Sequence, residues 1–329
     1  MELAIYFANY ERLTEIDQAL HAVDLTEIPG YLSVALFQLD PNLTDDVGNV
    51  TALKWMNPLM AQQGLDFTRL YFGQEFCQNL TPPPEEVEMA YYFSRQQGWQ
   101  FTYVTGGYLA EPSLEVTRRN LEKLAELEPT AEVVFNDWGV FRMMRRDFPD
   151  FVPIMGRILN KQTRLNLFTE TGDELPISRD SINLDFEELR RNQIEAYRDV
   201  NISNPDYLPH LHAWGVRGID MDITPQGVER PEDGWNLQLG FYYPWGFIAT
   251  ARNCPTAGTL DLARMFIVKD KSCGKPCRKY NCSPNLLQFD TPLVMRGPTL
   301  FVFHADYAAP YFNGQVKYER LIYQPYIPL

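Results

Sequence analysis

The sequence predicts a single α/β domain over residues 1–329, built as a TIM-like (β/α)8 barrel that is incomplete or irregular in places. Three observations support this class: short β-type runs alternate with amphipathic helical runs, the connections are short, and the number of units approaches eight. The 329 residues are 45% hydrophobic, enough for one large core. A doubly wound open sheet is the alternative, but no G-x-G-x-x-G follows a predicted strand.

The predicted strands are short apolar runs, several of which end at glycine or at a polar turn. They are Leu3–Phe7, Tyr31–Phe37, Thr68–Phe72, Gln100–Val104, Glu132–Phe135, Phe151–Met155, Arg217–Met221, Leu237–Tyr243, Leu300–Phe303 and Lys317–Tyr323. The predicted helices have apolar residues at helical spacing or capping signals at their starts. They are Glu85–Gln97, a helix capped by Ser113 that runs to Leu127, Trp138–Asp147 and Phe186–Arg198.

One long segment, residues 160–209, interrupts this alternation. It is rich in acidic residues, namely Asp173, Glu174, Asp180, Asp185, Glu187 and Glu188. An insertion of this length between barrel strands forms a lid, a partner surface or simple decoration, and the sequence does not choose among them.

The charge balance limits the classes of partner. A net charge of −14 and an isoelectric point near 4.8 argue against broad binding of nucleic acid or of an anionic membrane. No apolar run reaches the ~18–20 residues of a membrane span, and the first residues do not resemble a secretory signal. We therefore expect a cytoplasmic protein, in which clustered cysteines bind a metal or catalyse a reaction.

Cysteines are the most informative residues of the chain. Four lie in the short loop 254–282, as Cys254, Cys273, Cys277 and Cys282, while Cys77 lies far upstream after a predicted strand. Thiolate sulfur ligates zinc and iron–sulfur clusters, and the Gly and Pro inside C-G-K-P-C favour a tight loop. Counting residues alone selects the local quartet as the metal site.

Three further residues are candidates for catalysis. Asp220 and Asp222 alternate at the end of a predicted strand, where barrel enzymes place acid and base groups. Arg252 stands two residues before Cys254 and is suited to binding cluster sulfur or an acidic substrate. A capping or salt-bridging role for the two aspartates and a surface salt bridge for Arg252 are the structural alternatives.

Several segments in the same order resemble one known family. They are LYFGQEFC at 70–77, FNDWGV at 135–140, FVPI at 151–154, GFIATARNC at 246–254 and KDKSCGKPC at 269–277. The chain resembles the collagenase-like peptidase family (U-thirty-two) over roughly residues 65–323, and within it the UbiU/UbiV branch, which serves oxygen-independent hydroxylation in anaerobic ubiquinone biosynthesis.

The resemblance implies a [4Fe–4S] cluster held by Cys77, Cys254, Cys273 and Cys277. Cys282 is then a spare thiol, or the alternative fourth ligand, and zinc is the alternative metal. It also implies a UbiU-like partner subunit and a quinone or other aromatic small-molecule substrate.

The sequence also departs from the family pattern. Asn253 stands between the arginine and the cysteine of the segment 246–254, and Thr224 or Gln226 falls in the neighbourhood of the peptidase glutamate. Other functions that stay open are a peptidase, a zinc-stabilised binding or scaffold protein, and an RNA base hydroxylation factor, which the acidic charge disfavours.

Overall fold

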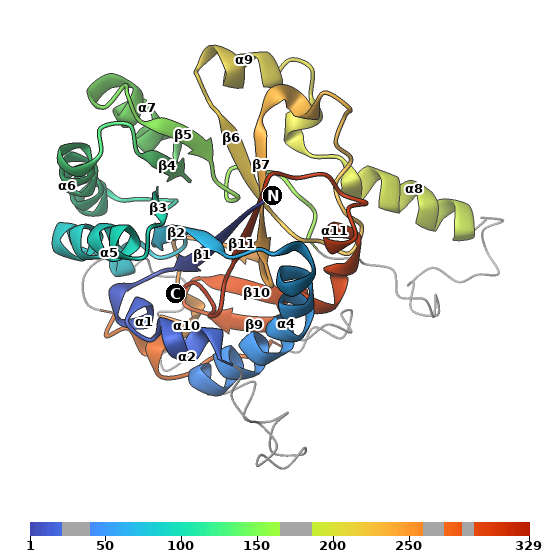
Figure 1. Cartoon of the computed structure of the whole chain (residues 1–329), viewed down its shortest axis with the longest axis horizontal. Coiled ribbons are helices and arrows are strands. Elements are labelled where there is room, and N and C mark those ends of the chain that lie inside the picture. Colours follow the sequence, from blue (N-terminus) through green and yellow to red (C-terminus); the bar gives the residue numbers. More distant parts are fainter. Residues whose placement is uncertain (22–39, 165–185, 259–272, 285–292) are drawn as a thin grey trace.

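The computed structural model describes residues 1–21, 40–164, 186–258, 273–284 and 293–329, and its centre is a closed barrel of eight parallel strands (Figure 1). The strands follow one another around the barrel in the order β1-β11-β7-β6-β5-β4-β3-β2. Their bounds are β1 Glu2–Phe7, β2 Phe67–Gly73, β3 Gln100–Val104, β4 Glu132–Phe135, β5 Val152–Met155, β6 Gly218–Asp222, β7 Gln238–Tyr243 and β11 Arg320–Tyr323. The TIM-like barrel class is confirmed, and the barrel is closed.

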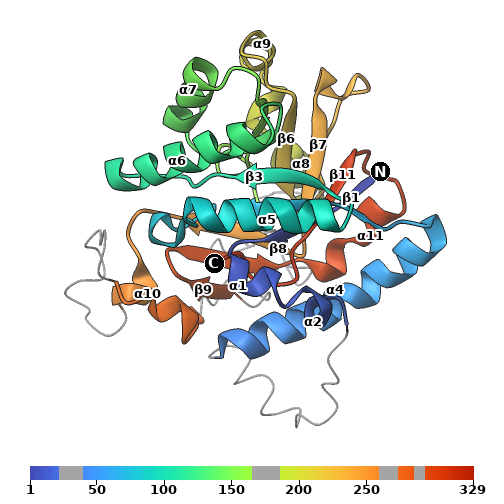
Figure 2. The same ribbon diagram turned by 60° about the vertical axis from the view of Figure 1, so that its left-hand side comes forward.

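Helices surround this barrel, and α5 and α6 lie side by side along its outer wall (Figure 2). The helices are α1 Tyr10–Leu13, α2 Ile16–Leu20, α4 Pro41–Gln63, α5 Pro84–Gln96, α6 Glu111–Leu127, α7 Trp138–Asp147, α8 Phe186–Arg198, α9 Leu208–Ala213, α10 Pro255–Gly258 and α11 Ala309–Phe312. The prediction that Ser113 caps α6 is wrong, because the helix begins two residues earlier and Ser113 lies in its first turn. No helix of the described segments is long and apolar enough to cross a lipid bilayer.

A second, three-stranded antiparallel sheet stands beside the barrel in the order β8-β10-β9. It consists of β8 Trp245–Thr250, β9 Leu293–Arg296 and β10 Thr299–Phe303. The predicted strand Leu300–Phe303 therefore belongs to this sheet and not to the barrel. The predicted strand Tyr31–Phe37 lies outside the described residues, and β1 pairs directly with β2.

Charged side chains close the N-terminal end of the barrel. Arg320 donates from Nε to Glu2 at 2.6 Å and from Nη1 to Glu132 at 2.6 Å. Arg69 donates from Nε to the other oxygen of Glu2 at 2.8 Å. These four residues point inward because alternate residues of every barrel strand face the lumen, and their charges balance.

The next lumen layers are mainly apolar and aromatic. Ala4, Tyr6, Tyr71, Val104, Val134, Ile154, Tyr242 and Ile322 form this inner cluster. Asp220 also faces the lumen, opposite Gly240 on β7. A Cβ atom at position 240 would collide with Oδ1 of Asp220, so glycine is required there for the carboxylate to fit.

The small sheet covers the C-terminal end of the barrel. Trp245 and Phe247 of β8 and Phe301 of β10 pack against Phe76, which follows β2. On the other side α4 approaches closely, since a Cβ atom at Gly48 would lie 2.5 Å from the Trp245 ring. The mouth that barrel enzymes usually leave open is therefore occupied by protein.

The predicted insertion 160–209 has two parts in the structure. Residues 165–185 lie outside the described segments, while α8 projects away from the barrel (Figure 1). Residues 160–164 belong to the barrel end: Gln162 is buried, donates from Nε2 to the Asp222 carbonyl at 2.8 Å and accepts from the Asp222 N–H at 2.9 Å. The insertion thus begins later than predicted.

Candidate functional site

Four cysteines that are distant in the sequence line one pocket at the C-terminal rim of the barrel. Cys77 follows β2, Cys254 follows β8, and Cys273 and Cys277 come from the short segment after residue 272. Apolar residues form much of the remaining wall, namely Phe76, Leu80, Pro276 and Pro298. The structure therefore places Cys77 beside the other three, as the family resemblance implies.

Local hydrogen bonds fix the loop that carries Cys77. The side-chain oxygen of Gln74 accepts from the N–H of Phe76 at 3.0 Å and from the N–H of Cys77 at 3.4 Å. Gly73 has a φ of 137°, which favours glycine, and a Cβ there would collide with the Val104 carbonyl. The chain can thus turn sharply at the strand end and direct Cys77 to the rim.

The other three cysteines lie on two tight turns. The N–H of Ala257, in α10, donates to the sulfur of Cys254 at 3.3 Å. Between Cys273 and Cys277, Gly274 and Lys275 have φ values of 65° and 51°, so the chain doubles back in the left-handed region. This turn brings the two sulfurs to the same wall.

Burial favours the protonated form of Cys77, Cys254 and Cys277 in the absence of a metal. Desolvation raises the pKa of Cys77 to about 12 and that of Cys277 to about 11, and it also raises the pKa of Cys254. The neighbouring cysteines act in the same direction, because adjacent thiolates repel one another. A bound cation would reverse this balance, since a coordinating thiol is deprotonated outright.

Cys282 occupies a different position. Its N–H donates to the Met295 carbonyl at 2.9 Å and its carbonyl accepts from the Met295 N–H at 2.7 Å, which joins it to β9. It is not part of the pocket wall, although it lies near enough to Cys254 to influence the pKa of that thiol. The quartet chosen by counting neighbours in the sequence is therefore not the set that shares the pocket.

The four thiols share the wall of one pocket. Among the described residues, no group of three or more His, Cys, Asp and Glu side chains is arranged to hold a single metal ion. Arg252 and Lys275 line the same pocket and are exposed, so two positive charges stand beside the sulfurs. The pocket wall therefore combines four thiols with two cationic side chains.

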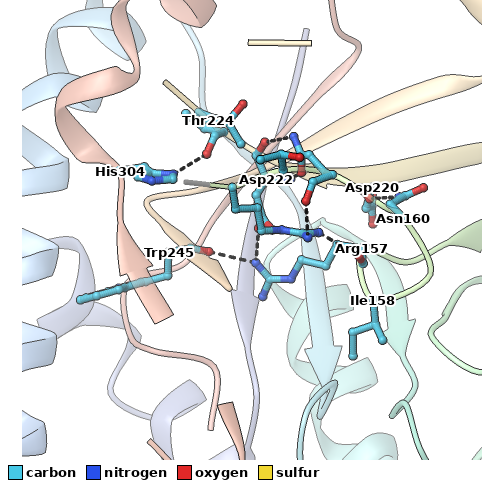
Figure 3. Close-up of polar contacts among 12 residues, drawn as sticks. Arg157, Ile158, Asn160, Asp220, Asp222, Thr224, Trp245 and His304 are labelled. Carbon is cyan, nitrogen blue, oxygen red and sulfur yellow. Dashed lines mark hydrogen bonds and ion pairs between the residues drawn. The ribbon is translucent and has the colours of Figure 1, made fainter. Parts of the chain in front are cut away.

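A buried ion-pair network lies under this site (Figure 3). Arg157 is fully buried and donates to Glu75 from Nη2 at 2.7 Å, to Asp222 from Nη1 at 2.6 Å, and to the Trp245 carbonyl at 2.9 Å. Arg164 forms a second ion pair with Asp222. Asp222 therefore has the structural salt-bridge role that was the alternative to catalysis.

The other two catalytic candidates lie in contrasting environments. Asp220 is buried in the lumen, and burial raises its pKa to about 8. Its Oδ2 atom has no hydrogen-bond partner among the described residues. Arg252 is exposed on the pocket wall, so it is the candidate that a bound group can reach.

No sequence pattern indicated Arg157 and Arg164. Arg157 is a lone arginine just after β5, and its partners lie 82 and 65 residues away in the chain. An unusual number of charged residues at inward-facing strand ends is the one pattern that points to such a network.

Comparison of the chain with protein-family models, with curated proteins and with solved structures finds no match.

Proposed function

We propose that this chain holds a [4Fe–4S] cluster on Cys77, Cys254, Cys273 and Cys277. The observation that carries this proposal is the presence of these four thiols, from three separate segments, on the wall of one pocket. Cysteine thiolates are the usual ligands of such clusters, four for each. Apolar wall residues limit the access of water, which protects a cluster that oxygen and water degrade.

The family resemblance favours a cluster over zinc, because four thiolates suit either metal. Around one zinc ion the sulfurs lie about 3.8 Å apart, given a Zn–S distance of about 2.3 Å and tetrahedral angles. The cysteines of a cubane cluster bind four different iron atoms and therefore stand further apart. Among the described residues the four thiols share one pocket, and sulfide and zinc analysis distinguishes the two arrangements.

The chain's own residues would tune such a centre. The N–H of Ala257 donates to the sulfur of Cys254, and hydrogen bonds of this kind stabilise negative charge on sulfur and raise the reduction potential. Arg252 and Lys275 offset the charge of the thiolates. When bound, a cluster with four protein ligands supplies one-electron transfer or structural support, because no iron is open to substrate.

We further propose that the chain is one subunit of an oxygen-independent hydroxylation system in the cytoplasm, with a UbiU-like partner subunit that binds a quinone or other aromatic substrate. This role rests on the resemblance of the cysteine-bearing segments to the UbiU/UbiV branch. Asp222 is held in ion pairs by two arginines, Arg157 and Arg164. Arg252 is the candidate that can contact a bound group.

The decisive experiment is metal analysis of anaerobically purified protein. We expect about four iron and four sulfide per chain with little zinc. Cys77→Ser should lose at least half of the iron, while the matched control Cys282→Ser retains it. One zinc per chain, or a cluster that survives Cys77→Ser and is lost in Cys282→Ser, would contradict the proposal.

The hydroxylation role needs a separate test. The iron-loaded chain should bind a UbiU-like partner in anaerobic gel filtration, and the complex should hydroxylate a quinone precursor without oxygen. Retention of full hydroxylation in the iron-deficient Cys77→Ser chain would remove the cluster from that role.

A further inference from the structure

A second concave surface adjoins the thiol pocket, and we call it the α6 groove. Its walls are the N-terminal end of α6, the loop after β2 and residues 273–275. Gln78, Asn79, Cys273 and Lys275 line both the groove and the thiol pocket. A molecule bound in the α6 groove would therefore lie directly beside Cys273.

Among the described residues that line the α6 groove, the charged ones are two cations, Arg119 and Lys275, and none is an aspartate or glutamate. This is notable in a chain with a net charge of −14. Within the described segments neither cation has an ion-pair partner, whereas the adjacent Arg118 pairs with Asp147 at 2.8 Å. Two uncompensated positive charges thus face one concave surface.

Hydrogen-bond donors add to the two charges. The side-chain oxygen of Gln78 accepts from the Ala110 N–H at 2.7 Å, which fixes the amide so that its NH2 group is left for another acceptor. Ala110 precedes α6, a helix of 17 residues, and no side chain caps this end. The positive end of the helix dipole therefore adds to the field of Arg119 and Lys275. Glu111 and Glu115 of α6 are not groove wall residues.

We infer that the α6 groove binds a small organic anion through its carboxylate or phosphate group. The inference rests on the proposed function only for the identity of the neighbouring centre, because the groove's cations attract an anion whether or not iron is bound. A charge-assisted hydrogen bond from arginine is well suited to either oxyanion. The bound anion would lie next to Cys273, which lines the same groove.

The two cations differ in a way that permits a test. Lys275 lines both pockets, so its charge also compensates a centre on the thiols, whereas Arg119 lines the α6 groove alone. If both cations served only as counterions for that centre, Arg119 would be dispensable for anion binding. If the groove is a binding site, Arg119→Gln should lose the anion while the iron content stays unchanged.

The experiment is isothermal titration calorimetry of the anaerobically purified full chain with citrate and, separately, with inorganic phosphate, at low and at high salt. Iron is measured on the same samples. We expect binding that weakens with salt, and a loss of affinity of about tenfold in Arg119→Gln and in Lys275→Gln. The matched control is Arg142→Gln on α7, an exposed arginine away from the groove, which should bind as the wild type does.

Binding of citrate alone identifies a carboxylate ligand, and binding of phosphate alone identifies a phosphate ester. No binding of either anion, an unchanged affinity in Arg119→Gln, or an equal loss in Arg142→Gln overturns the inference. A single-stranded RNA oligonucleotide that binds more tightly than both anions would replace the small molecule by a nucleic-acid backbone. If the protein contains no iron but binds citrate, the cluster proposal is refuted and the anion site is supported. If the protein contains iron but binds neither anion, the anion site is refuted and the cluster proposal is supported.

Discussion

Arg157 and Glu75 form a fully buried ion pair in which Nε and Nη2 of the arginine lie 3.1 Å and 2.7 Å from Oε2 of the glutamate. Glu75 precedes Cys77 by two residues, and Arg157 also bonds the carbonyl of Trp245 at the start of β8, the strand that leads to Cys254. One guanidinium group therefore ties together two of the segments that carry cysteines.

Replacing Arg157 should be severely destabilising. In Arg157→Met the carboxylates of Glu75 and Asp222 lose a buried partner, and we expect the free energy of unfolding to fall by about 3–5 kcal/mol. Urea denaturation followed by circular dichroism measures this. The matched control is Arg95→Gln, which breaks a partly exposed pair with Glu128 and should cost less than about 1 kcal/mol. Equal losses in the two variants would contradict this account.

Asp220 should lower stability at neutral pH. Burial raises its pKa to about 8, so between pH 4 and pH 8 the folded chain binds a proton that the unfolded chain releases. Stability contributed by this group is therefore present at low pH and is lost as pH rises towards 8. Asp220→Asn should increase the free energy of unfolding at pH 8 by about 2–4 kcal/mol and change little at pH 4. A gain that is independent of pH in urea titrations would argue against it.

Gly240 should be intolerant of a side chain for one specific reason. A methyl group there meets the carboxylate of Asp220 inside a closed lumen, so Gly240→Ala should cost about 1–3 kcal/mol. The cost should shrink in a chain that also carries Asp220→Ala, because the clashing oxygens are gone. A double-mutant cycle on thermal unfolding measures this coupling, and strictly additive effects would contradict it.

His304 should make the fold sensitive to mild acid. Burial lowers its pKa from 6.5 to about 4, although Nδ1 bonds the Ile223 carbonyl at 2.7 Å. Below pH 6.5 His304 is protonated in the unfolded chain but stays neutral in the folded chain. The free energy of unfolding is therefore highest above pH 6.5 and falls by up to about 3 kcal/mol towards pH 4. His304→Gln should flatten this decline in urea titrations at pH 7.5 and pH 5. A parallel decline in both proteins would refute the assignment.

Metal removal should leave Cys77 unreactive. With a thiol pKa of about 12, roughly one molecule in 10⁴ carries the thiolate at pH 8, and the thiolate is the reactive form. We expect chelator-treated, folded protein to be alkylated at Cys77 much more slowly than the same protein in urea, as mass spectrometry of the labelled peptide would show. Equal rates would mean that the pocket wall does not persist without its centre.

The barrel could be predicted because its strands carry strong local signals. Thr68–Phe72 and Gln100–Val104 are apolar runs bounded by glycines or polar turns; the structure has the second as β3 and extends the first by one residue at each end to form β2. The small sheet could not be predicted, because only Pro244 separates β7 from β8. The sequence of the two strands together is one continuous aromatic run. A prediction from periodicity cannot tell where such a run changes sheets.

The candidate site divides in the same way. The residues that flank Cys77 resemble the family motif and predicted that Cys77 groups with the downstream cysteines. In the structure it lines one pocket with Cys254, Cys273 and Cys277. The roles of Asp222 and Arg157 depend on contacts between strand ends that lie far apart in the chain, and no spacing rule encodes those contacts.

The barrel is closed at both ends. Charged side chains, among them Glu2 and Arg320, close the N-terminal end, and the small sheet covers the C-terminal end. Enzymes that work from an open barrel mouth change substrates by exchanging the loops around it. In this chain that mouth is covered, so a bound molecule would reach the thiol pocket from the outer rim.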